Sequence, residues 1–371
     1  MNNNKKYFLP RDLFDDFLQV IRVNCDQVLG PQVIEGAIQY YPISSSSELP
    51  TGIMDRQDLG SYRLIMTDSP RQFAWANGVQ ALKPLLFLPQ DVVWVCTQTS
   101  DGQVAFDKPL QTIKSTAVLG VRACDLAALA LQDKHFLQGE FVDEAYQARR
   151  EALFLIAVNC SHPASTCFCH STDDGPNAVS GFDVVLTELD NGFILATGSQ
   201  RAESWLAPLL LTLSPADHDA LSLAQAQYES AVAIQQRKLP SGNLEARLFS
   251  RLEHSEWQQV AEQCLACGNC TQVCPSCFCH KEEDLAPLGS DVTEHVRLWD
   301  SCFSDGHGYM AGHQSRPKIA DRYRQWMTHK LGAWHSQYGS SGCVGCGRCM
   351  TWCPAGIDFV EVANRLCQET P

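Results

Sequence analysis

The chain has 371 residues, of which 45% are hydrophobic and 19% are charged, a balance typical of folded globular proteins and not of disordered or fibrous ones. Its formal net charge of −14 argues against nucleic-acid binding, because phosphate groups are bound by basic surfaces. The 18 cysteines cluster at the spacings of metal ligands, so in a chain of this length they indicate metal binding and not disulfides.

The N-terminal residues show no signal for export. Residues 1–15 include Lys5, Lys6 and Arg11 but no apolar run, which argues against a signal peptide. No stretch approaches about 18 consecutive apolar residues, so no membrane span is expected. We therefore expect a cytoplasmic protein, in a reducing compartment where thiols stay free to hold metal.

The first half of the chain has the pattern of an α/β domain. Apolar residues at helical spacing predict a helix over residues 11–24, and residues 45–60, rich in Ser, Gly and Pro, are expected to form a loop. Beyond this loop, short β-rich runs alternate with helical stretches, which predicts a partly parallel sheet. The predicted strands are residues 92–95, 117–121, 154–158 and 183–186, with a helix over residues 125–132.

A domain boundary is predicted near residue 240. Residues 202–237 and 245–263 are expected to be helices, and Lys238-Leu-Pro-Ser-Gly242 between them is a cluster of helix breakers. We expect a mixed α+β fold, with an α/β domain over residues 1–240 and a mainly helical, ferredoxin-type domain over residues 241–371.

Two cysteine runs in the C-terminal third share one spacing. They are Cys264-Leu-Ala-Cys267-Gly-Asn-Cys270-Thr-Gln-Val-Cys274-Pro275 and Cys343-Val-Gly-Cys346-Gly-Arg-Cys349-Met-Thr-Trp-Cys353-Pro354. Both match the C-x₂-C-x₂-C-x₃-C-P run of bacterial-type ferredoxins, in which three cysteines wrap one cluster and the fourth ligates the other. The spacing predicts two [4Fe-4S] clusters, one held by Cys264, Cys267, Cys270 and Cys353, the other by Cys343, Cys346, Cys349 and Cys274.

Several residues around these runs have expected roles. Gly268, Gly345 and Gly347 would let the backbone approach the clusters and aim N–H groups at sulfur. Arg348 either raises the potential of the second cluster by stabilising its reduced state or is an ordinary solvated arginine. The helix-like sequence between the runs resembles the α-helical ferredoxin domains of succinate-dehydrogenase-type iron–sulfur subunits. Zinc is the alternative metal, but zinc sites normally take one C-x₂-C pair from each of two segments.

A third [4Fe-4S] site is predicted in the α/β domain. Cys124 and Cys160 follow predicted strands, and Cys167 and Cys169 lie in the next loop, at the sheet edge where ligands gather in α/β proteins. Asp125 could cap the following helix, whose N-terminal dipole would favour a thiolate at Cys124. The alternative is a group of buried, inert thiols, which is also the interpretation we favour for two further cysteines, Cys25 and Cys96.

A short repeat leaves three more thiols beside the clusters. Thr166-Cys-Phe-Cys-His170 is echoed by Ser276-Cys-Phe-Cys-His280, just after the first run. We expect Cys277, Cys279 and Cys302 to pack near the clusters; the alternatives are that they ligate further metal or replace a cysteine in the cross-ligation. The nearby His280, His307 and His313 are expected at the surface or as hydrogen-bond partners of ligands.

With these motifs the chain resembles the iron–sulfur β subunits of cytoplasmic NiFe sulfhydrogenases and the related cluster-binding subunits of anaerobic sulfite reductases. The resemblance covers about residues 85–365. Besides both ferredoxin runs, it rests on Val121-Arg-Ala-Cys-Asp-Leu126, Asn159-Cys160, Thr166-Cys-Phe-Cys169, Trp299-Asp-Ser-Cys302 and His329-Lys330.

The resemblance implies a role in a multisubunit complex. Members of this family pass electrons between a partner that binds flavin and NAD(P) and a separate catalytic partner with a NiFe or sirohaem-type centre. The sequence has no G-x-G-x-x-G dinucleotide loop and no phosphate-binding P-loop, so substrate chemistry is expected to belong to the partners. Two alternatives remain, a reductase with its own substrate site at the N-terminal cluster and a structural zinc protein.

Overall fold

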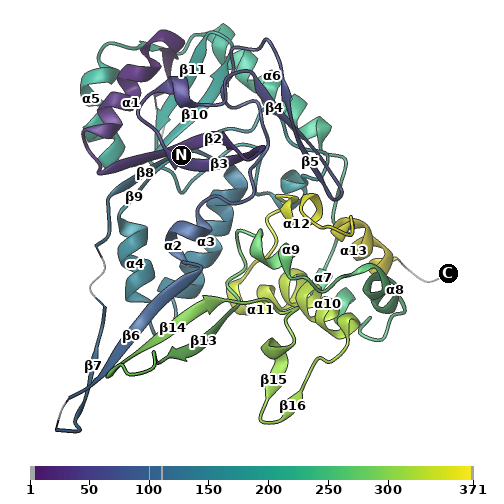
Figure 1. Ribbon diagram of the computed structural model, residues 1–371. Helices are drawn as coiled ribbons and strands as arrows, with labels where there is room; N and C mark the ends of the chain where they lie inside the picture. Colours follow the sequence, from purple (N-terminus) through teal and green to yellow (C-terminus); the bar gives the residue numbers. More distant parts are fainter. Residues whose placement is uncertain (1–4, 100, 110–111, 369–371) are drawn as a thin grey trace.

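The computed structural model describes residues 5–99, 101–109 and 112–368, and it has the mixed α/β fold expected from the sequence (Figure 1). Its strands form an eight-stranded sheet, a four-stranded sheet and two short hairpins. Helices dominate residues 244–275 and 319–367, the two segments that contain the ferredoxin runs. Within the described residues, no helix is both long enough and apolar enough to span a membrane.

The eight-stranded sheet has a parallel centre and antiparallel edges. Its order is β12-β1-β11-β10-β9-β8-β2-β3, and the strands β2, β8, β9 and β10 run parallel. Three of the predicted strands are β8, β9 and β10, so the expected partly parallel sheet is confirmed. The strands are β1 Tyr7–Pro10, β2 Gln27–Ile34, β3 Ala37–Pro42, β8 Thr116–Val121, β9 Leu153–Val158, β10 Val184–Leu189, β11 Gly192–Thr197 and β12 Ser214–Pro215.

Helices cover both faces of this sheet, which explains why β8 and β9 are entirely buried. One face of the sheet packs against α1 (Phe14–Arg22) and α5 (Gln200–Leu210), and side chains such as Ile156 fill the space between them. The other face packs against α2 (Lys83–Leu86), α3 (Ala123–Leu137) and α4 (Glu144–Glu151).

The four-stranded sheet joins sequence from both sides of residue 240. Its order is β13-β14-β6-β7, and β6 pairs with β14 to join two hairpins. The first hairpin is β6 (Gln90–Gln98) with β7 (Val104–Asp107), and the second is β13 (His280–Leu285) with β14 (Val292–Trp299). Of the helix-like sequence expected between the ferredoxin runs, residues 319–338 are helical, but residues 280–299 form this hairpin instead. Cross-strand pairs favour it: His295 stacks on Trp94 with ring centroids 4.5 Å apart. The division near residue 240 stays a prediction.

Local sequence patterns misplaced several other elements. The expected loop over residues 45–60 contains strand β4 (Ile53–Asp58), which pairs with β5 (Ser61–Met66). The expected helix over residues 202–237 is two helices, because Pro215 lacks an N–H and lies in the edge strand β12. The remaining elements are α6 His218–Ile234, α7 Leu244–Phe249, α8 Glu256–Gln263, α9 Asn269–Gln272, β15 Tyr309–Met310, β16 His313–Gln314, α10 Ile319–Thr328, a π-helical turn His329–Ala333, α11 Trp334–Tyr338, α12 Arg348–Thr351 and α13 Phe359–Cys367.

An extended stretch over residues 71–78, here called the bridging segment, runs from the sheet to the cysteine-rich region. Its start is fixed by Glu188 at the carboxyl end of β10, whose side chain is buried. The Glu188 carboxylate accepts hydrogen bonds from the backbone N–H groups of Gln72 at 2.7 Å and Phe73 at 2.8 Å. It also pairs with Arg11 at 3.1 Å, so the carboxylate satisfies three donors.

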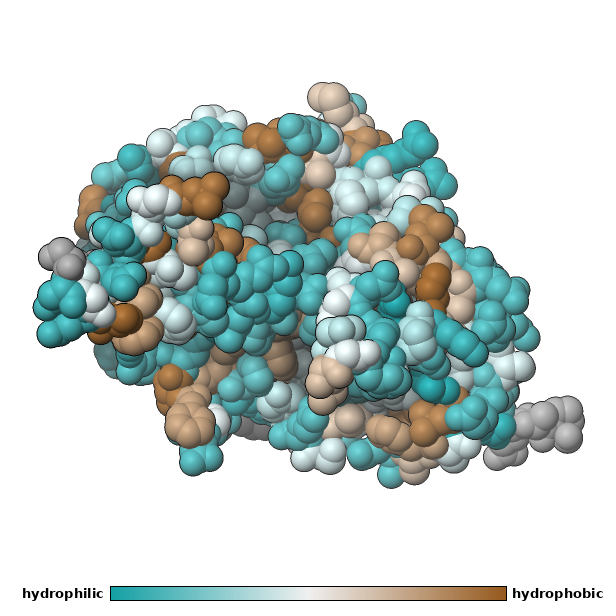
Figure 2. All heavy atoms as spheres, turned by 60° about the horizontal axis from the view of Figure 1, so that its bottom comes forward, coloured by the Kyte–Doolittle hydropathy of each residue, from teal (hydrophilic) through white to brown (hydrophobic). Residues whose placement is uncertain are grey.

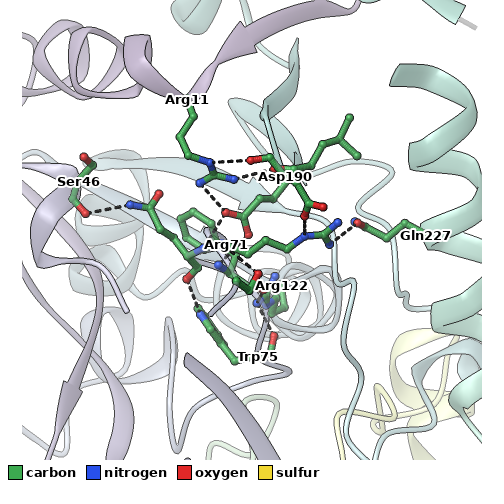
Figure 3. Close-up of polar contacts among 12 residues, drawn as sticks. Arg11, Ser46, Arg71, Trp75, Arg122, Asp190 and Gln227 are labelled. Carbon is green, nitrogen blue, oxygen red and sulfur yellow. Dashed lines mark hydrogen bonds and ion pairs between the residues drawn. The ribbon is translucent and has the colours of Figure 1, made fainter. Parts of the chain in front are cut away.

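Two arginines hold the rest of the bridging segment (Figure 3). Arg71 pairs with Asp190 at 2.7 Å and donates to Gln227 at 2.7 Å. Arg122 lies over the Trp75 ring, 4.0 Å from its centroid, and donates to several backbone carbonyl groups of the segment. The segment therefore delivers its last residues to the cysteine-rich region in a fixed position.

We expect Glu188→Ala to lower the free energy of unfolding by about 3 kcal/mol, because it leaves buried backbone donors and a cation without an acceptor. The measurement is chemical unfolding under anaerobic conditions. Glu203→Ala, at an exposed position of α5, is the matched control and should change stability by less than about 0.5 kcal/mol. Equal effects of the two substitutions would show that the bridging segment does not depend on Glu188.

Candidate metal centres

The predicted ligands of the first cluster face one cavity. Cys264, Cys267, Cys270 and Cys353 all line a cavity of about 450 Å³, which Cys349 also reaches from the second run. Its remaining wall is largely aromatic and aliphatic, and includes Phe303, Tyr323, Trp326, Ile357 and Phe359. Soft thiolates in an apolar setting suit an iron–sulfur cluster.

The Cys270 thiol of this first quartet needs a bound metal to ionise. Burial, together with the neighbouring thiolates of Cys264, Cys353 and Cys267, raises the pKa of Cys270 well above its ordinary value. Without metal, this thiol therefore keeps its proton at neutral pH. Binding of a positively charged cluster would displace the proton, so metal uptake is coupled to proton release.

The second quartet also lies together, next to a buried lysine. Burial and then the thiolates of Cys343, Cys346 and Cys274 raise the pKa of Cys349 well above its ordinary value. Lys330, in the π-helical turn, lies beside this quartet and is only 4% exposed.

Lys330 keeps its charge although it is buried. Its ammonium donates to Ser276 Oγ at 3.0 Å and to the Gly342 carbonyl oxygen at 3.1 Å. Burial alone would lower its pKa, but thiolates that include Cys274 and Cys343 raise the pKa of Lys330 well above its usual value. Lys330 is therefore a buried positive charge beside the second quartet, the role that the sequence suggested for Arg348.

Arg348 is buried, so the alternative of a solvated arginine is wrong. Its guanidinium pairs with both oxygens of Asp125, at 2.7 and 3.3 Å, and donates to the Gly78 carbonyl oxygen at 2.8 Å. Burial opposes its charge, but Asp125 and the thiolates of Cys346 and Cys124 raise the pKa of Arg348 well above its ordinary value. Because Asp125 balances the charge, its effect on a cluster is weaker than that of an unpaired cation.

Asp125 does not cap helix α3, contrary to the expectation from sequence. Arg122 occupies the N-cap position, and Asp125 lies in the first turn with its side chain 1% exposed. The carboxylate is oriented by the Arg348 guanidinium, which binds both of its oxygens. The start of α3, including Cys124, is thereby fixed against the second ferredoxin run.

The glycines of the second run pack on the Thr166–Cys169 loop. A Cβ atom on Gly347, which has a φ of +74°, would lie 2.4 Å from the Thr166 carbonyl oxygen. A Cβ atom on Gly345 would lie 2.6 Å from Cys169 Cα. Thr166 and Thr351 also share a hydrogen bond of 2.7 Å between their hydroxyl groups. The predicted role of Gly345 and Gly347 toward the cluster stays a prediction, but no larger residue fits at either position.

Gly268 in the first run is subject to a similar constraint. Its φ is +74°, and a Cβ atom there would lie 2.8 Å from Ser301 Oγ. Thr271 donates to the same Ser301 oxygen at 2.9 Å. The first run therefore packs on the loop that carries Cys302, as the second run packs on the loop that carries Cys167 and Cys169.

The four N-terminal cysteines predicted as a third site lie together and beside the second run. Burial and then Cys169, Cys160 and Cys346 raise the pKa of Cys167 well above its ordinary value. The pKa of Cys124 is likewise raised by burial, with Cys346 and Cys169 among the contributing neighbours.

Asn77, at the end of the bridging segment, links the third site to the second run. Its amide donates to the Cys346 carbonyl oxygen at 2.9 Å and to the Cys167 sulfur at 3.8 Å. In the described part of the chain, no three His, Cys, Asp or Glu side chains converge closely enough to hold a single metal ion. A cubane instead takes one ligand at each of four irons and spreads its ligands further apart.

Comparison with known proteins identifies the family. Residues 263–357 match the 4Fe-4S dicluster domain family. The chain is 32% identical over 252 residues to sulfhydrogenase 2 subunit beta of Pyrococcus furiosus. The aligned region covers 67% of this chain and 73% of the relative. The chain belongs to the sulfhydrogenase beta subunit family. The resemblance inferred from the sequence is thus confirmed, and this family member is an iron–sulfur electron-transfer subunit with two [4Fe-4S] clusters.

Sequence reasoning missed buried polar residues that the first half of the chain contributes to these centres. Asn77 is one, and Lys83 is another: its ammonium donates to the carbonyl oxygens of Thr271 and Gln272 at 3.2 and 3.3 Å. A signal was present, because Lys83 is a lone charge within the apolar run Ala81-Leu-Lys-Pro-Leu-Leu-Phe87. Such a residue needs a partner if the run is buried.

We expect Asp125→Ala to lower the free energy of unfolding by about 3–5 kcal/mol, because it leaves the Arg348 guanidinium buried without a counter-charge. Anaerobic chemical unfolding provides the measurement. The double variant Asp125→Ala with Arg348→Met should recover part of this loss. Lys108→Ala, which breaks an exposed pair with Glu144, is the control and should lower the free energy of unfolding by at most about 1 kcal/mol. If Asp125→Ala lowered it by no more than this control does, a structural role for the buried pair would be contradicted.

Proposed function

We propose that this subunit relays single electrons between a flavin- and NAD(P)-binding partner and a catalytic partner with a NiFe or sirohaem-type centre. The observation that carries the proposal is the continuity of the three cysteine quartets through the interior. Cys353 of the second run lines the cavity of the first quartet, Cys274 of the first run is a neighbour of Cys349, and the third quartet adjoins the second at Cys346. Membership of the sulfhydrogenase beta subunit family supports the same role.

In this proposal each quartet is a set of cluster ligands. When bound, each [4Fe-4S] cluster accepts and releases one electron at a time. The ligands are Cys264, Cys267, Cys270 and Cys353 for the first cluster, Cys343, Cys346, Cys349 and Cys274 for the second, and Cys124, Cys160, Cys167 and Cys169 for the third.

The surrounding residues exclude water and set the local charge. The aromatic wall that includes Tyr323 and Trp326 keeps the first site apolar. Lys330 places a positive charge beside the second quartet, which favours the more negative, reduced state of a cluster there. Arg348 does so less, because its charge is paired with Asp125.

Electrons need routes to and from partner subunits. The first quartet is the most accessible: Cys267 is exposed, and Leu265 beside it is 66% exposed. Figure 2 shows apolar residues in several separate groups among hydrophilic ones on one face of the molecule. Exposed apolar side chains such as Phe106 and Met310 provide contact area away from the first quartet. These features support docking of more than one partner.

A reductase with its own substrate site is the second candidate function. A cavity of about 900 Å³ lies between helix α3 and residues 172–181 and reaches Cys343. A small molecule in this cavity would lie close to the second quartet. The structural zinc protein is less well supported, because the matched domain family is defined by two 4Fe-4S clusters.

We expect NAD(P)H to reduce the clusters only when a flavin-binding partner subunit is present. The anaerobically purified chain would be mixed with NAD(P)H, with and without the co-purified partner, and followed by electron paramagnetic resonance. Cluster signals should appear only with the partner, because the chain has no dinucleotide-binding loop. Oxidation of NAD(P)H, or reduction of sulfite or polysulfide, by the chain alone would contradict the relay and favour the reductase.

The third site is tested by Cys167→Ser with Cys169→Ser. The double variant should contain about four iron atoms fewer per chain than the parent, because one cubane is lost. Iron and acid-labile sulfide are measured on the anaerobically reconstituted chain. Cys25→Ser, at a thiol that donates to backbone carbonyl groups of Ile21 and Gln27, is the matched control. An unchanged iron content in the double variant would refute the third site.

A further inference from the structure

Three thiols outside the quartets face a separate cavity. Cys277, Cys279 and Cys302 line a cavity of about 850 Å³ next to the first run. Cys277 and Cys302 are buried, at 7% and 8% exposure. The Cys302 thiol donates a hydrogen bond to the Cys279 sulfur, so these sulfur atoms are already adjacent. The Cys277 thiol also contacts Cys274 of the second quartet. Three thiols that are not themselves quartet members thus line one cavity, with the wider spacing that a cubane and not a single ion requires, which makes this cavity a candidate cluster site.

A histidine completes the set of soft ligands around the cavity. His307 lines the same cavity, and its Nδ1 lies 3.0 Å from the Asp300 carboxylate. The carboxylate accepts a hydrogen bond from Nδ1–H, and this tautomer leaves the lone pair of Nε2 free to bind metal. Metal-binding histidines usually have this arrangement, in which the second nitrogen donates to a carboxylate that fixes the tautomer. Asp300 lies two residues before Cys302, so one loop positions both ligands.

The loops that carry these thiols repeat the arrangement at the third site. Ser276-Cys-Phe-Cys-His280 repeats Thr166-Cys-Phe-Cys-His170. Ser301, immediately before Cys302, is bonded to the first run through Thr271 and is closely packed on a glycine of that run. Thr166, immediately before Cys167, is bonded to the second run in the same way. Each ferredoxin run therefore has one additional cysteine-bearing loop packed on it.

The charges around the cavity suit an anionic cluster. Lys330 and Arg316 both line it, and the Lys330 ammonium is held by Ser276, the residue before Cys277. A cluster with three thiolates and one neutral imidazole carries net negative charge, which these cations offset. An apolar wall formed by Phe278, Trp326 and Trp334 limits the access of water.

We infer that Cys277, Cys279, Cys302 and His307 Nε2 hold an additional [4Fe-4S] cluster next to the first ferredoxin run. Its electron-transfer role rests on the proposed function; its assembly does not. It exchanges one electron at a time with the first-run cluster, one centre being oxidised as the other is reduced, and no proton or further reactant is required. The site would add a further centre to the relay, beside the ferredoxin pair.

The test is iron and acid-labile sulfide analysis of the anaerobically reconstituted full-length chain. We expect about sixteen iron atoms per chain, falling to about twelve in Cys279→Ser with Cys302→Ser. Cys96→Ser, at a thiol on β6 that faces none of the four sites, is the matched control and should keep the parent content. Combining the Cys279 and Cys302 substitutions with those at Cys167 and Cys169 should remove about eight irons.

A gentler variant tests the histidine without removing a thiol. His307→Ala leaves three thiolates, so we expect loss of about one iron and a new signal from an oxidised three-iron cluster in electron paramagnetic resonance. His307→Cys should restore the four-iron content with an altered spectrum. An unchanged spectrum and iron content in His307→Ala would overturn the ligand assignment.

Other outcomes would overturn the inference as a whole. Unchanged iron in Cys279→Ser with Cys302→Ser, or stoichiometric zinc at this site in the parent chain, would show that the cavity holds no cluster. The proposed function can fail separately. If the Cys167 and Cys169 substitutions still remove iron while those at Cys279 and Cys302 do not, only the additional site is refuted.

Discussion

The buried ion pair between Arg348 and Asp125 joins the two parts of the molecule on which the metal centres depend. Both side chains are 1% exposed, and 223 positions separate them in the chain. A buried pair of this kind contributes little net stability compared with apolar packing, but its geometry is exacting because neither charge tolerates another position. It sets the start of α3, and with it Cys124, against the run that contains Cys346.

The same guanidinium binds the bridging segment, which extends this constraint to the sheet. Its donation to Gly78 fixes the end of a segment whose start is held by Glu188 at the edge of β10. Asn77, one residue earlier, contacts both the second run and Cys167. The register of the parallel strands therefore determines where the third quartet stands relative to the ferredoxin pair. These contacts keep thiols from segments far apart in the sequence at fixed separations.

Local sequence patterns predicted what local forces decide. The buried strands β8, β9 and β10 were evident as apolar runs, and the cysteine spacing grouped residues that line a common cavity. Contacts between residues far apart in the sequence could not be predicted in this way. Asp125 has a side chain suited to capping a helix, yet it binds the guanidinium of Arg348, 223 positions later in the chain. The hairpin β13–β14 pairs with β6, and nothing within its own sequence specifies that edge.

Lys330 shows why the centres cannot be understood one at a time. Its ammonium lies between Ser276 and Gly342, which precede Cys277 and Cys343, so one charge lies close to the second quartet and to the additional thiols. In a low-dielectric interior a unit charge acts over several ångströms with little screening. With a cluster on each side, Lys330 would stabilise the reduced state of both. Electrons added to both centres would still repel each other across this short separation, which makes simultaneous reduction of both centres less favourable than stepwise passage of one electron.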